Sequence, residues 1–492
     1  MRALSPPVNR AAGGDRVLVP VLGTCVLVST AAYLMVFTML GQIAASLHAS
    51  GTLVNWTVIA TIITATVSAA LFPALGSVIG QRRLMMAAMA CLAVGSLVSA
   101  AAPDAPTLLA GRIIAAPGFA GSALSVAIVR RHVPGEGLPR AYGVIAAFAG
   151  AAAGVGFIAG GLAEEAASGD WRPVFLAMAA VSALTGALAA VTIPDGPGAP
   201  RRADVPGALL LAGGLVAALL PITEGATWGW TSWRVTGLLA AALALLAAWL
   251  AAEVRRTEPL VKIGALALPG VGGGTLLFVV TAATVGVVNL TVPAFLEAPS
   301  AAGYGTAASV LTAGLDLLPF ALAITAAGLL AGRLARRVPA RVIAVGTLAC
   351  EALALALLAG FHHTGAQVVI FLAVFGAGHG GTLAVEYVLL TGAVPPAAAG
   401  GVTGVASAAD GVSGAVASAV TTALLAASLV HVGGTAFPAA ADYSNAWLAG
   451  AAIAAAGALV TAVGAAWQPA PLSGRARRAW AGSLGAGDPL GQ

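Results

Sequence analysis

The chain has 492 residues, of which 59% are hydrophobic and only 8% are charged, and its mean hydropathy is +0.97. Soluble domains carry about 25% charged residues, so this composition excludes a water-soluble domain and indicates a membrane protein with many spans. The net charge is +5, and the sequence holds no basic run with interleaved aromatics of the kind that binds nucleic acid. The three cysteines lie in apolar segments, and we expect neither a metal site nor a cofactor.

Residues 1–15 and 469–492 are polar and are expected to form two cytoplasmic tails. A span needs about 20 apolar residues, and fourteen segments between the tails satisfy this requirement. They lie near 16–40, 53–75, 84–102, 107–129, 141–163, 173–193, 205–223, 234–252, 271–295, 306–331, 340–360, 367–391, 402–430 and 445–467.

Arginine placement supports this count. If both termini are cytoplasmic, almost all of the 23 Lys and Arg residues fall in cytoplasmic loops and tails. This is the distribution that the positive-inside rule predicts, and losing one span would invert every later loop. Arginine is far commoner than lysine and alanine is abundant, which suggests a GC-rich bacterial genome. We therefore expect a multi-pass protein of a bacterial cell membrane.

The sequence carries a weak internal repeat. The loop after the second span contains Gly80, Arg82 and Arg83, and the loop after the tenth reads GRLARR at 332–337. The fifth and thirteenth spans are both rich in glycine. These pairs match if a six-helix bundle at 16–195 and another at 266–468 flank a two-helix insert at 196–265. Repeated halves with a site between them are a transporter pattern.

Glycines gather in the fifth span, which reads GAAAGVGFIAGG from residue 150. Small residues four apart form rows on a helix face and let another backbone approach closely in lipid. We expect this segment to serve helix packing or gating, and ordinary membrane packing is the alternative. The glycines concerned are Gly150, Gly154, Gly156, Gly160 and Gly161.

Several short motifs carry a family resemblance. The middle of the chain reads DVPG at 204–207, TEG at 223–225 and EPL at 258–260, and the tenth span reads GLDLLP at 314–319. On these motifs the chain resembles the fourteen-span drug:proton antiporter branch (EmrB/QacA-like) of the major facilitator superfamily. The resemblance implies an all-α membrane protein, not an enzyme. It implies export of small, largely hydrophobic or cationic molecules by proton antiport and alternating access.

The partners that the resemblance implies are a small-molecule substrate, protons and the lipid bilayer, and we expect a monomer. The family's functional motifs are only partly kept. The loop motif after the second span retains Gly80, Arg82 and Arg83, and the fourth span retains Arg112. Ala32 stands where the family usually has an acidic residue in the first span. This leaves an alternative open: a dedicated exporter of one endogenous metabolite with weak or altered proton coupling.

Ionisable groups deep in a bilayer are costly and are functional candidates by default. Arg112 can act as a fixed positive charge beside a carboxylate or an anionic substrate. Asp316, Glu386 and Asp410 are candidates for carrying the proton, because a carboxyl group can take up a proton when desolvated and release it when wetted. Glu351 is expected to face inward. For each residue the alternative is a packing role without transport function.

Overall fold

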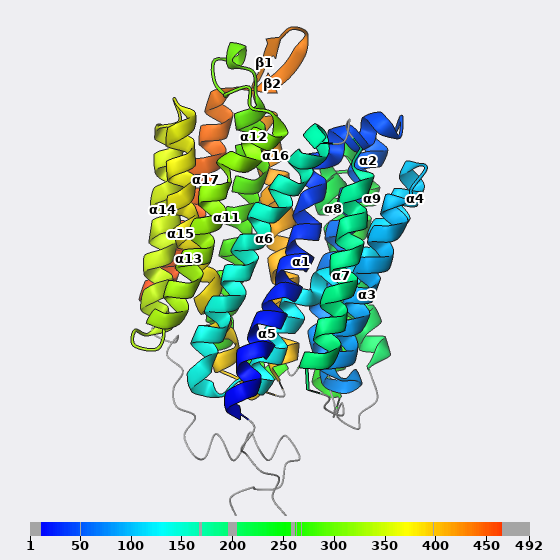
Figure 1. The fold of residues 1–492 in the computed structure, drawn as a ribbon, viewed down its shortest axis with the longest axis vertical. Helices are drawn as coiled ribbons and strands as arrows, with labels where there is room; N and C mark the ends of the chain where they lie inside the picture. The colour runs from blue at the N-terminus through cyan, green and yellow to red at the C-terminus, as the bar shows by residue number, and fades with distance from the viewer. Residues whose placement is uncertain are drawn as a thin grey trace, which may run out of the picture.

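The computed structural model describes residues 11–49, 51–166, 170–194, 204–256, 261, 263–266, 268–396 and 398–464. Within them lie 14 segments long and apolar enough to cross a membrane, which confirms the predicted number of spans. The spans form one bundle of roughly parallel and antiparallel helices (Figure 1).

Spans one to seven use the elements α1 (Ala11–Ser46), α2 (Gly51–Ile79), α3 (Gln81–Ala100), α4 (Ala105–Ala115), η1 (Ala116–Ala120), α5 (Gly121–His132), η2 (Gly135–Gly137), α6 (Leu138–Ala166), α7 (Arg172–Thr192) and α8 (Val205–Trp228). The others use α9 (Trp233–Arg255), α11 (Pro269–Glu297), α12 (Val310–Asp316), α13 (Leu318–Leu334), α14 (Ala340–Gly360), α15 (Gly365–Gly392), α16 (Ala399–Leu425) and α17 (Ala440–Val463). Two short helices, α10 (Ile263–Leu266) and η3 (Ser300–Ala302), lie between spans.

Two spans are interrupted where the sequence places proline. The fourth span passes from α4 through the 3-10 turn η1, which contains Pro117, into α5. The tenth span breaks between α12 and α13, and Pro319 lies at the start of α13. Proline lacks the N–H that would continue the preceding helix, so each break has a local cause. Both breaks lie within spans predicted as continuous.

A β-hairpin joins α16 to α17 and was not predicted. The thirteenth span ends at Leu425, and β1 (Leu429–Val432) then pairs antiparallel with β2 (Thr435–Pro438). Gly433 and Gly434 form the turn with φ of 57° and 85°, a conformation that suits the tight turn of a two-residue hairpin. The hairpin projects from the upper end of the bundle, opposite the end where α1 begins (Figure 1).

Two helix pairs join the first six spans to the last six. α6 packs along α13 and contacts α12, while α2 packs along α16. In span order these are five with ten and two with thirteen, so the two contacts are equivalent under the predicted repeat. The largest buried apolar cluster also contains side chains from both parts, such as Leu22, Tyr142, Phe278 and Leu390. The two parts therefore share a continuous core in this conformation.

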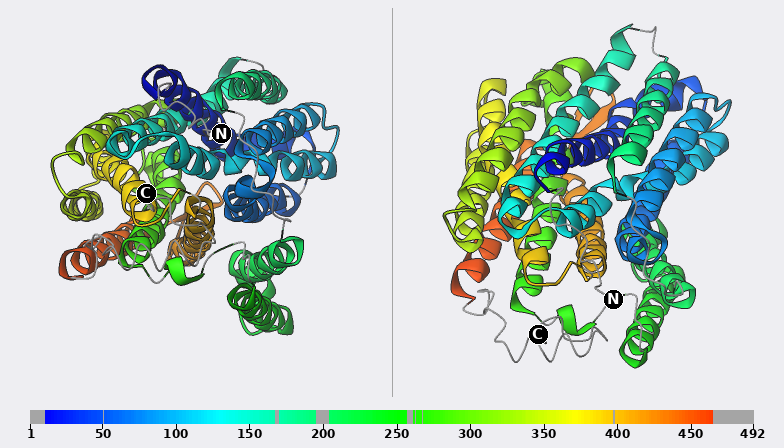
Figure 2. Two further views of the ribbon diagram at one scale, coloured as in Figure 1. Left: turned by 90° about the horizontal axis from the view of Figure 1, so that it is seen from below. Right: turned by 60° about the horizontal axis from the view of Figure 1, so that its bottom comes forward.

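α8 and α9 pack on each other at the rim of the bundle (Figure 2). α8 also contacts α2 and α16, the helices of one of the two joining pairs. The exact boundaries of the predicted 6+2+6 division, and the cytoplasmic placement of both termini, stay predictions. The bundle face at which α1 begins is called the lower face below, and the hairpin face the upper face.

Candidate functional site

Arg112 lies in the last turn of α4 and is only 1% exposed. Its Nη1 and Nη2 atoms both donate to the backbone carbonyl of Ala32 at 3.4 Å, and its Nε has no hydrogen-bond partner. The guanidinium lies over the rings of Phe119 and Phe175, at 5.3 and 5.9 Å from their centres. Among the described residues no carboxylate forms an ion pair with Arg112.

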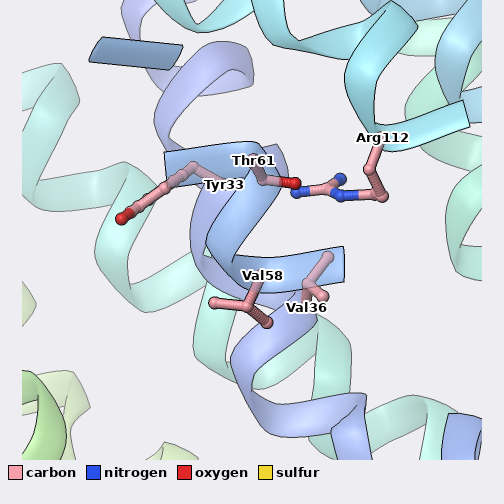
Figure 3. A pocket seen from close by; sticks show the side chains of 5 residues that line it. All are labelled: Tyr33, Val36, Val58, Thr61 and Arg112. Carbon is pink, nitrogen blue, oxygen red and sulfur yellow. The ribbon is translucent and has the colours of Figure 1, made fainter. Parts of the chain in front are cut away.

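A small pocket borders this guanidinium. Figure 3 shows its lining, in which Arg112 reaches from α4 toward Thr61 of α2, and Tyr33 and Val36 come from α1. Val58 completes the lining, and the Thr61 hydroxyl donates to the carbonyl of Thr57 at 2.6 Å. The space measures about 160 Å³ with open solvent included, less than the 300–1,000 Å³ of typical ligand pockets. A substrate would need this region to open.

Two fully buried carboxyl groups lie in the other half of the chain. Glu351 of α14 is 0% exposed; one carboxyl oxygen accepts from Thr382 of α15 and the other from Thr284 of α11, each at 2.9 Å. Glu386 of α15 is 1% exposed and accepts from Thr281 of α11 at 3.3 Å. Three helices therefore converge on two carboxyl groups, close enough for their charges to interact.

The threonines of α11 connect these carboxyl groups through one helical turn. Thr284 also lies 3.1 Å from the carbonyl oxygen of Thr281, so its hydroxyl sits between that oxygen and Glu351. Thr382 likewise reaches the hydroxyl of Thr347 at 3.0 Å. Hydroxyl groups both donate and accept, so this arrangement can hold either form of each carboxyl group. Sequence reasoning passed over these threonines, although threonine recurs in otherwise apolar spans.

Asp410 of α16 is a third carboxyl group, and it connects Glu351 and Glu386 electrostatically with the first half of the chain. It is half-buried, and its charge acts on both Glu386 and Tyr33 of α1. Tyr33 is in turn within electrostatic reach of Arg112. A series of ionisable side chains therefore crosses the bundle from Arg112 to Glu351, and it contains four of the five ionisable candidates from the sequence.

Asp316, the fifth candidate, ends α12 directly before the break in the tenth span. Its side chain is half-buried, and among the described residues it forms no hydrogen bond or ion pair. Among the described residues, Asp316 therefore makes no direct polar contact with the other four ionisable candidates.

His379 was not predicted from the sequence. It lies on α15 one turn before Thr382 and is 6% exposed, and its Nδ1 has no hydrogen-bond partner among the residues that the structure describes. Its ring stacks on Phe375 with a centroid distance of 5.7 Å. The sequence could have indicated His379 as a candidate, because it is a polar residue in the apolar twelfth span and shares a helical face with Glu386.

A contact between the halves near the lower face was also missed. Arg130, at the end of α5, donates from Nε to the carbonyl of Thr391 at 2.9 Å and from Nη2 to that of Val394 at 2.7 Å. The Tyr142 hydroxyl lies 2.8 Å from that of Thr391. From the sequence, Arg130 counted only as one of the arginines that indicate a cytoplasmic loop. Its hydrogen-bond partners lie more than 260 positions further along the chain, so the contact could not be predicted.

The glycines of α6 face two different partners. An added Cβ at Gly150, Gly154 or Gly161 would meet α13 or α12, so these three line the contact between the halves. A Cβ at Gly156 would instead meet Leu34 of α1 at 2.9 Å, within the first half. Gly160 is buried. Gly156 therefore does not share the row formed by Gly150 and Gly154.

The loop motif after the second span (Gly80, Arg82 and Arg83) begins with a glycine whose backbone conformation favours glycine. Gly80 precedes α3 with φ of 107°, a conformation that other residues rarely adopt. Arg82 is half-buried and Arg83 is exposed. On α8, Glu224 is buried at 5% exposure.

Comparison with known proteins gives one family model, the Major Facilitator Superfamily, which matches residues 22–208. A puromycin resistance protein of Streptomyces alboniger is 34% identical over 285 residues, which cover 57% of this chain and 54% of that protein. A tetracenomycin C resistance and export protein of Streptomyces glaucescens is 28% identical, covering 48% and 44%. The chain thus spans about half the length of these relatives.

A further match covers more of the chain. The multidrug resistance protein Stp of Mycobacterium tuberculosis is 29% identical over 370 residues, which cover 72% of this chain and 65% of Stp. Among solved structures, the proton:xylose symporter XylE superposes with a TM-score of 0.62 at 15% identity, covering 92% of this chain and 95% of that one. The human organic anion transporter MFSD10 gives 0.60 at 16% identity, covering 94% and 100%. At these identities the structural matches show the fold alone.

Proposed function

Because this chain belongs to the major facilitator superfamily, a family of transporters, we propose that it is an exporter of small, largely hydrophobic molecules. It works by alternating access and takes up protons in exchange for its substrate. Export rests on the relatives, which are named as resistance and export proteins.

The observation that supports proton exchange is the pair of buried carboxyl groups, Glu351 and Glu386. An ionised carboxylate in an apolar interior is costly, and each group has only threonine hydroxyls as hydrogen-bond donors among the described residues. Protonation removes that cost in the closed conformation, and wetting of the site in an open conformation restores ionisation. A carboxyl group that changes its protonation with conformation is what coupling to a proton gradient requires.

The helix contacts support movement between the two halves. α6 meets α13, and α2 meets α16, through glycines whose added Cβ would strike the partner backbone, as at Gly404 against the Ala70 carbonyl. Such close, flat contacts lack interlocking side chains and are suited to small shifts of one helix past another. The hydrogen bonds from Arg130 to Thr391 and Val394 would then have to break for the two halves to separate near the lower face.

The test is transport into and out of proteoliposomes with an imposed pH gradient. The probes are ethidium, puromycin and 4-(1-pyrenyl)butyrate, and the variants are Glu386→Gln and Glu351→Gln. Wild-type protein should move at least one probe only while the gradient is present. Glu386→Gln should still exchange that probe across the membrane but lose at least tenfold in gradient-driven accumulation.

Glu224→Gln is the matched control, because Glu224 is also a buried carboxyl group but belongs to α8, outside both joining helix pairs. Glu224→Gln should accumulate the probe in response to the pH gradient as the wild type does. Probe movement that ignores the gradient in the wild type would rule out proton antiport and leave a transporter of another kind. Equal coupling in wild type, Glu386→Gln and Glu351→Gln would remove both carboxyl groups from the mechanism.

A second candidate function is export of one endogenous metabolite with altered proton coupling. Two observations favour it: Ala32 stands where the resemblance implies an acidic residue, and two of the relatives are named for a single compound, puromycin and tetracenomycin C. A transporter that ignores the three probes but moves an extract component of its own cell would support this candidate.

A further inference from the structure

Among the described residues, no carboxylate neutralises the charge of Arg112. The side chain is 1% exposed, no carboxylate pairs with it among the described residues, and its Nε–H has no acceptor. Arginine stays protonated under essentially all conditions, so this site cannot become neutral by losing a proton. A buried cation without a counter-ion is unfavourable unless something else supplies the negative charge.

The interactions that Arg112 does make are weak substitutes for an anion. Two N–H groups share one carbonyl oxygen, that of Ala32, at the long distance of 3.4 Å. The faces of Phe119 and Phe175 add cation–π attraction, which does not consume N–H donors. The guanidinium has five N–H groups in a planar fork, and among the described residues its buried Nε–H is without an acceptor.

Asp410 is the candidate carboxyl group of the second half whose charge reaches Tyr33, a residue that lines the pocket beside Arg112. Its charge acts on Tyr33 and Glu386, and it makes no ion pair with Arg112. In the part of the chain that the structure describes, no acidic group is in ion-pair contact with Arg112.

We propose that Arg112 receives an acidic group of the transported molecule, and that the substrates are amphiphilic organic acids. The guanidinium fork matches a carboxylate in a bidentate manner. Apart from Arg112 and the hydroxyl-bearing Thr61, the pocket is lined by Val36, Val58 and Tyr33, which favours a largely apolar remainder of the ligand. The proposal rests on the proposed export function and narrows its substrate class away from the cationic molecules first considered.

The test compares 4-(1-pyrenyl)butyrate with its methyl ester, which share one apolar body and differ by the acid. Binding to the full-length purified protein is followed by energy transfer from tryptophan to pyrene. Wild type should bind the acid at least tenfold more tightly than the ester. Arg112→Gln should bind the two equally, with ester binding unchanged.

Ala32→Asp is the second variant, and it keeps the arginine. It places a carboxylate beside the carbonyl that Arg112 now contacts, so it should satisfy the guanidinium internally and remove the preference for the acid. Arg172→Gln is the control, because Arg172 lies outside the pocket, where it pairs with Asp170. It should retain the wild-type preference.

Equal binding of acid and ester by the wild type would overturn the proposal, as would an acid preference that survives in both Arg112→Gln and Ala32→Asp. Binding is repeated with added phosphatidylglycerol: a preference abolished by the lipid would assign the site to a headgroup and overturn the substrate class. These outcomes are separable from the export function. Gradient-driven efflux of ethidium or the ester, independent of Arg112, would retain export while rejecting organic acids.

Discussion

The guanidinium of Arg130 donates to the backbone carbonyl of Thr391 at 2.9 Å, across a separation of 261 residues. A cation from the first half of the chain thus caps the last turn of α15 in the second half, where the helix leaves its carbonyl groups without partners. Its second bond, to the carbonyl of Val394, lies just beyond the end of α15. The two halves are thus joined near the lower face by a charge-to-backbone contact, and among the described residues no ion pair reinforces it.

Arg130→Gln should release this cap and favour opening of the lower face. Hydrogen bonds to charged groups contribute about 1.5–3 kcal/mol each, and 1.4 kcal/mol corresponds to a tenfold change in an equilibrium. Val394→Cys, in a background lacking the three native cysteines, should therefore react about tenfold faster with a polar maleimide in nanodiscs when Arg130 is replaced. Arg131→Gln changes an exposed neighbour and should leave the rate unchanged. Equal rates in both variants would show that the cap does not control opening.

Two glycines of the spans should respond oppositely to alanine. At Gly150 a Cβ would lie 2.6 Å from Ile324 and 2.8 Å from the Thr325 nitrogen, so α6 and α13 must separate. Gly150→Ala should lower stability by about 1–3 kcal/mol and slow transport. At Gly346 of α14 a Cβ meets nothing within 4 Å, so Gly346→Ala should be neutral or slightly stabilising. Thermal unfolding in one detergent measures both, and similar shifts would contradict a tight α6–α13 contact.

Thr382→Val should destabilise the protein because it leaves an oxygen of Glu351 without its donor. We expect a loss of about 1 kcal/mol, between the 0.6 kcal/mol average for bonds within membrane proteins and the 1–3 kcal/mol cost of an unpaired buried group. The same change in a Glu351→Leu background should cost much less, since no acceptor remains. Thr461→Val is the control, because that hydroxyl donates only within its own helix. Additive losses in the double variant would argue against the bond.

Tyr304 gives a pH-dependent prediction at the upper face. Its hydroxyl donates to the carbonyl of Pro438 in the hairpin, and burial raises the pKa of this phenol. A raised folded-state pKa means that the stabilisation is fully present below the unfolded value of about 10 and is lost as the pH rises through the folded value. The melting temperature should therefore fall more steeply above about pH 10 in wild type than in Tyr304→Phe. Parallel slopes would show that the phenol does not contribute.

Hydropathy and arginine placement were enough to predict the fourteen spans, because both depend on the order of residues along one helix. Gly80 was similarly readable, since its place between two spans requires a turn. The break at Asp316 and the hairpin at 429–438 were missed because an apolar segment reads as one span whether or not its helix is continuous. Pro117 and Pro319 were the local signals of the two breaks.

The site was only half predictable, because contacts between helices depend on which face each helix turns inward. Arg112, Glu351, Glu386 and Asp410 were identified as costly groups in apolar spans. The sequence did not reveal that Thr284 and Thr382 bind Glu351, nor that Gly156 faces α1 while Gly150 faces α13. Both facts depend on helix rotation, which composition and spacing leave undetermined.

The unneutralised charge at Arg112 also bears on the membrane voltage. If a substrate with one negative charge leaves the cell while protons enter, its exit is equivalent to moving one positive charge inward. The net charge moved inward in each cycle is therefore the number of protons plus one. A potential of 100 mV contributes about 2.3 kcal/mol for each elementary charge moved. Export of an acid would then be electrogenic even with a single proton, and a negative interior would drive it when the pH gradient is absent.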